Sequence, residues 1–82
     1  MTYTPVMAPQ MSLANDFRAC CINNWQRLVR EGVPRDEARK IAEAIARFEL
    51  LEKAPSSEQK QLISQFSRFV CRAQLWHSEL LL

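Results

Sequence analysis

The sequence is poor in glycine and has an odd number of cysteines. Its 82 residues contain one glycine, Gly32, and three cysteines, two of which are adjacent. One glycine is too few for a glycine-rich loop that wraps a nucleotide phosphate. Three cysteines make a poor disulfide framework, and a chain with reduced thiols is typical of the cytoplasm. We therefore expect a cytoplasmic protein that has neither stabilising disulfides nor a phosphate-binding loop.

Long apolar runs and leader patterns are also missing. No stretch approaches the roughly 18 apolar residues that a membrane-spanning helix needs. Residues 1–12 hold no basic cluster and no apolar run, so we expect neither a secretory signal nor a membrane partner. Hydrophobic residues make up 48% of the chain and charged residues 24%, which is the balance of a folded domain.

Patterns that indicate catalysis or metal binding are weak. The residue types that bind soft metals are few: Cys20, Cys21, Cys71 and His77. On a helix, adjacent cysteines and residues six positions apart do not point at one ion. The chain has two aspartates, and no pair of carboxylates lies on an apolar face. We expect a non-enzymatic protein with no catalytic residue, metal or cofactor.

What the chain does have is the apolar periodicity of helices. Apolar residues recur at steps of three and four over three segments, about residues 13–31, 35–54 and 57–80. Gly32 suits the left-handed residue that ends a helix, and Pro34 suits the first turn of the next. Ser56 and Gln59 have the capping-box spacing that opens the third. Since both connections are short, the predicted fold class is all-α, with three antiparallel helices in a small bundle.

The N-terminus differs from the rest of the chain. Residues 1–11 contain two prolines and no apolar period, so we expect a flexible N-terminal arm. Residues 12–82 are then a single helical domain. At this size one core is only marginally sufficient, since about 60% of the unfolded surface can be buried.

The third segment carries two different faces. Its large apolar residues are expected to form core: Leu62, Phe66, Phe69, Ala73, Trp76 and Leu80. On a helical wheel the opposite side presents Arg68, Cys71, Arg72, Leu75 and Leu82. Apolar groups beside arginines are typical of protein interfaces, so these five residues are the predicted partner surface. Single apolar residues are also common on ordinary surfaces, and this alternative stays open.

The leading functional interpretation is a protein-binding module. It is a small adaptor or modulator that docks on a larger protein, of unknown identity, and inhibits or redirects it. In size and class the chain is similar to small accessory proteins of phages and other mobile elements, an analogy that no motif supports. A homodimer through the third helix is a further alternative.

A second interpretation is a small DNA-binding regulator. It would use the arginines around the first turn between helices: Arg27, Arg30, Arg35 and Arg39. A recognition helix places its N-terminal residues toward the bases, yet this one opens with Asp36 and Glu37. A net charge of only +2 also argues against a nucleic-acid partner.

Overall fold

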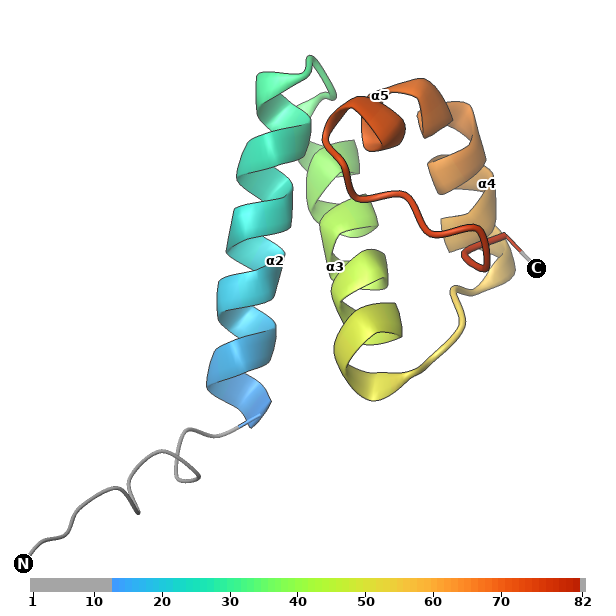
Figure 1. Cartoon of the computed structure of the whole chain (residues 1–82). Coiled ribbons are helices and arrows are strands. Elements are labelled where there is room, and N and C mark those ends of the chain that lie inside the picture. Colours follow the sequence, from blue (N-terminus) through green and yellow to red (C-terminus); the bar gives the residue numbers. More distant parts are fainter. Residues whose placement is uncertain (1–12, 82) are drawn as a thin grey trace, which may run out of the picture.

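The structure, a computed structural model, describes residues 13–81, with side chains described from residue 15 (Figure 1). Within that range the helices are Leu13–Arg30 (α2), Arg35–Leu51 (α3), Ser57–Gln65 (α4) and Ser67–Arg72 (α5). No strand occurs among residues 13–81, so the all-α class is confirmed. The arm predicted at residues 1–11 lies outside the described residues.

α2 and α3 form an antiparallel hairpin that is closed by a glycine cap (Figure 1). Gly32 has a φ of 110°, which a glycine adopts without strain. Its N–H donates to the carbonyl of Val29, and the N–H of Val33 donates to that of Leu28, both at 3.0 Å. These two bonds are a Schellman motif, and the buried pair Val33 and Leu28 supplies its usual apolar contact. The predicted glycine cap is confirmed.

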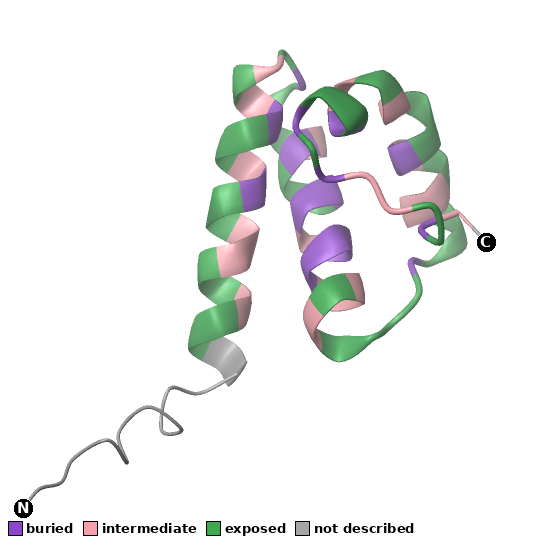
Figure 2. Cartoon of the chain, in the orientation of Figure 1, coloured by how far each residue is buried: buried purple, intermediate pink, exposed green. Residues whose placement is uncertain are grey.

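α3 is the central helix and holds more buried residues than any other helix of the described part (Figure 2). Its buried members are Ala38, Ile41, Ala42, Ala44, Ile45 and Ala46. Alanine side chains let a neighbouring helix come close, and the amide of Asn24 on α2 reaches the carbonyl of Ala42 at 3.4 Å. α2 therefore covers one side of α3, while α4 and the C-terminal part of the chain cover the other (Figure 1).

The prediction of one long third helix is wrong. Helical structure is interrupted at Phe66, whose φ of −108° and ψ of 25° leave the helical region, and it ends at Arg72. Two short helices and a non-helical return therefore replace the third antiparallel helix predicted over residues 57–80. The alternative of a homodimer through that helix assumed a continuous helical seam, which this fold does not have.

The end of α5 repeats the cap of α2 without a glycine. Gln74 has a left-handed φ of 62°. Its N–H donates to the carbonyl of Cys71 at 2.9 Å, and the N–H of Leu75 donates to Val70 at 3.1 Å. This is again the Schellman pattern, with Leu75 and Val70 both buried. The chain reverses here because the apolar contact stabilises a conformation that glutamine rarely adopts by itself.

Residues 73–81, the C-terminal segment, return across the face of α3 (Figure 1). Leu75 and Leu80 are 4% and 0% exposed, so the segment completes the core. Nη1 of Arg27 on α2 donates to the carbonyl of Ala73 at 3.3 Å. Further along, Nε2 of His77 lies 2.5 Å from Oε2 of Glu49 near the end of α3. The segment is thus tied to both helices of the hairpin.

Candidate functional site

The structure divides the five residues of the predicted partner surface. Arg68, Cys71 and Arg72 are exposed on α5, and their spacing of three and four places them on one face. Leu75 is buried, because the chain reversal after α5 turns it into the core, so its predicted exposure is wrong. Leu82 lies outside the described residues.

The four arginines of the DNA-binding interpretation are also divided. Arg35 and Arg39 are exposed on α3, one turn apart. Arg27 and Arg30 lie in the last turn of α2, where they line a depression together with Arg72 of α5. The structure therefore brings Arg27 and Arg30, from the predicted DNA-binding set, together with Arg72, from the predicted partner surface. Arg35 and Arg39 do not line this depression.

We name this depression the arginine depression. It has a volume of about 160 Å³ and is lined by Arg27, Arg30, Glu31, Arg72, Ala73 and Gln74. Only one carboxylate faces three guanidinium groups. Among the described residues neither Arg30 nor Arg72 forms an ion pair. These arginines lie in the last turns of α2 and α5, where they offset the partial negative charge of the helix ends. Each end carries only about half a charge, so three guanidinium groups provide more positive charge than is required to neutralise the two ends.

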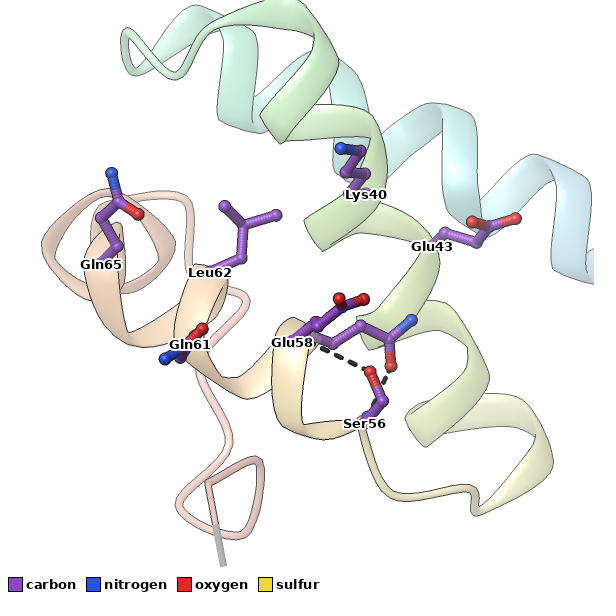
Figure 3. A pocket seen from close by; sticks show the side chains of 8 residues that line it. Lys40, Glu43, Ser56, Glu58, Gln61, Leu62 and Gln65 are labelled. Carbon is purple, nitrogen blue, oxygen red and sulfur yellow. Dashed lines mark hydrogen bonds between the residues drawn. The ribbon is translucent and has the colours of Figure 1, made fainter.

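A second depression, of about 430 Å³, lies between α3 and α4 (Figure 3). Lys40 and Glu43 reach it from α3, and α4 contributes Leu62 with three glutamines. The capping box forms one edge: the backbone N–H of Gln59 donates to Oγ of Ser56 at 3.2 Å, as predicted. Its charges are mixed, since Lys40 is opposed by Glu43 and Glu58, so no ligand chemistry is favoured.

A third depression, of about 500 Å³, is acidic. Its lining contains Phe48, Glu49, Glu52, His77 and Glu79. The Phe48 and His77 rings pack with their centroids 5.3 Å apart. Although Glu49 and His77 are in contact, they lie 28 positions apart in the sequence, and no local pattern relates them.

The carboxylate of Glu49 contacts both the thiol of Cys20 and the imidazole of His77. Sγ of Cys20 lies 3.6 Å from Oε1 of Glu49, whose other oxygen contacts His77. Burial, followed by the charge of Glu49, raises the pKa of Cys20. A nucleophilic thiol needs the opposite, a base or cation that lowers its pKa. Among residues 15–81 no three metal-binding side chains gather around one point.

Sequence reasoning missed Glu31, Ala73 and Gln74 as neighbours of the arginines. Ala73 and Gln74 adjoin Arg27 and Arg30 only because α5 ends at Arg72 and the chain reverses there, whereas Glu31 directly follows Arg30 in the sequence. No glycine marks that turn, so the sequence carried no signal for it.

The comparisons with known proteins give no family. No protein-family model matches the chain, and no curated protein and no solved structure resembles it significantly. None of the helices in the described part has the length and hydrophobicity of a membrane span. Function must therefore be inferred from the residues themselves.

Proposed function

We propose that the chain is a non-enzymatic binding module that docks on an acidic surface of a larger protein and inhibits or redirects it. The docking surface, which we name the arginine surface, consists of Arg27, Arg30, Arg68, Cys71 and Arg72. The observation that supports this proposal is the arginine depression, where three arginines from two helices adjoin a single carboxylate.

Arginine suits such a role better than lysine. Its guanidinium is planar and weakly hydrated, and it binds a carboxylate through two parallel hydrogen bonds. Arginine is accordingly enriched in protein interfaces. Arg30 and Arg72 have no ion pair to give up among the described residues, so docking costs no intrachain bond there.

The DNA-binding alternative has less support. Arg35 and Arg39 do not line the depression, and Asp36 and Glu37 occupy the first turn of the same helix. Carboxylates in that position repel the phosphates that a recognition helix must approach.

Charge reversal at the depression tests the proposal. The tagged chain is used to capture partners from nuclease-treated extract of the cells that express it, and the complex is then reconstituted from purified components. Arg30→Glu with Arg72→Glu should weaken the reconstituted complex by about a hundredfold, at roughly 1–2 kcal/mol for each lost charged contact. Arg27 is left unchanged because it holds the C-terminal segment.

The matched control is Arg18→Glu with Lys53→Glu, which changes the net charge equally at two exposed positions away from the depression. This control should bind as the original chain does. Both double variants should retain the helical circular dichroism of the original. Equal weakening by the two variants, or recovery of nucleic acid without a stoichiometric protein, would overturn the proposal.

A further inference from the structure

We propose that the arginine depression binds one phosphate monoester group on the partner. This inference rests on the proposed function and names the chemical group that the docking site recognises. The depression is of a size to take one such group rather than a long segment of chain, since its volume is about 160 Å³.

Charge favours phosphate over carboxylate. The lining supplies three positive charges and one negative charge, from Glu31. The ends of α2 and of the shorter α5 each add a partial negative charge of up to about one half, which leaves a positive charge of about 1 to 1.5. A phosphate monoester carries about −1.5 to −2 at neutral pH, so it is attracted more strongly to that charge than a carboxylate, which carries one.

The hydrogen-bonding capacity leads to the same group. A phosphate monoester has three strong acceptor oxygens, and a carboxylate has two. Each guanidinium has five N–H donors, so Arg27 keeps donors after Nη1 has bonded to the carbonyl of Ala73. That bond fixes Arg27 beside Arg72, while Arg30 follows Arg27 by three residues on the same helix. Three donor groups thus adjoin one small volume.

The geometry disfavours a nucleic-acid backbone. A phosphodiester has one charge and two free oxygens, and successive phosphates need cations in a row. Here the cations surround one depression, and Arg35 and Arg39 lie outside it. Glu31 in the lining repels a chain of phosphates, but the three arginines still leave a net positive charge for a single group.

The inference is tested on the full chain by following backbone amide signals in nuclear magnetic resonance. The probes are a blocked phosphoserine, inorganic phosphate, a blocked glutamate and an oligonucleotide with internal phosphates only, all at matched ionic strength. We expect blocked phosphoserine to shift the amides of residues 27–31 and 72–74 saturably. Blocked glutamate should bind at least about tenfold more weakly, because it offers half the charge.

Variants locate the binding. Arg30→Ala and Arg72→Ala should each weaken phosphoserine binding by about fivefold or more, and the control Arg18→Ala should not. Four results would each overturn the inference. Blocked phosphoserine could cause no saturable shift, or blocked glutamate could bind as tightly as it does. Inorganic phosphate could bind where blocked phosphoserine does not, or the oligonucleotide could bind more tightly than blocked phosphoserine. The charge-reversal experiment distinguishes this inference from the proposed function. If the partner is recognised through carboxylates, charge reversal still weakens the complex, but blocked phosphoserine does not bind better than blocked glutamate.

Discussion

Truncating Leu75 decides whether this residue belongs to the core or to the surface. Its side chain is 4% exposed, and it contacts the buried cluster at the point where the chain reverses after α5. Replacing a buried leucine by alanine costs about 2–5 kcal/mol, from lost burial and from the cavity that remains. Leu75 lies on a segment that can partly close around the gap, so we expect Leu75→Ala to cost about 2–3 kcal/mol.

That loss is large for a chain of this size. At about 0.05–0.15 kcal/mol per residue, the whole chain is stable by roughly 4–12 kcal/mol. Each kcal/mol corresponds to about 4–8 °C in a small domain, so the melting temperature should fall by roughly 10–20 °C. Thermal and urea unfolding followed by circular dichroism measures this change.

The control is Ile22→Ala on the exposed side of α2. Ile22 is 50% exposed, and alanine has the higher helix propensity, so stability should change by less than about 0.5 kcal/mol. If Leu75→Ala is as harmless as this control and yet abolishes partner binding, Leu75 is on the surface, as a continuous third helix would place it. The fold described for residues 73–81 would then be refuted.

The remaining predictions concern the backbone and the thiols. Gln74→Gly and Glu52→Gly should each raise the urea midpoint by the equivalent of about 0.5–1 kcal/mol, because both residues have positive φ; a lower midpoint would contradict this. At pH 8 a thiol reagent should label exposed Cys71 before Cys20, whose pKa is raised, and mass spectrometry after brief labelling identifies the order. Burial and Glu49 raise the pKa of Cys20 in the folded state above its unfolded pKa of about 9.0. The protonated thiol therefore stabilises the fold at pH values below about 9.0, and this stabilisation is lost as the pH rises through the folded-state pKa. Glu49→Gln should reduce that alkaline loss, measured by urea unfolding from pH 8 to 10.

Much of the first half of the fold could be predicted from the sequence. α2 and the start of α3 follow from apolar periodicity with Gly32 and Pro34 between them, and the capping box at Ser56 fixes the start of α4. These signals are local, since each depends on residues within one or two turns. The candidate site was only partly predictable: the sequence indicated Arg27, Arg30 and Arg72 but assigned them to different surfaces.

The two chain reversals, at Gly32 and at Gln74, separate what the sequence determined from what the tertiary structure decided. Both have the same hydrogen bonds and the same buried apolar pair. The turn at Gly32 can be predicted because glycine adopts positive φ without steric cost, so the sequence itself determines the first hairpin. At Gln74 the local preference is for continued helix, and the burial of Leu75 and Leu80 overrides it. Tertiary packing alone therefore ended α5, removed Leu75 from the surface and brought Arg72 beside the arginines of α2.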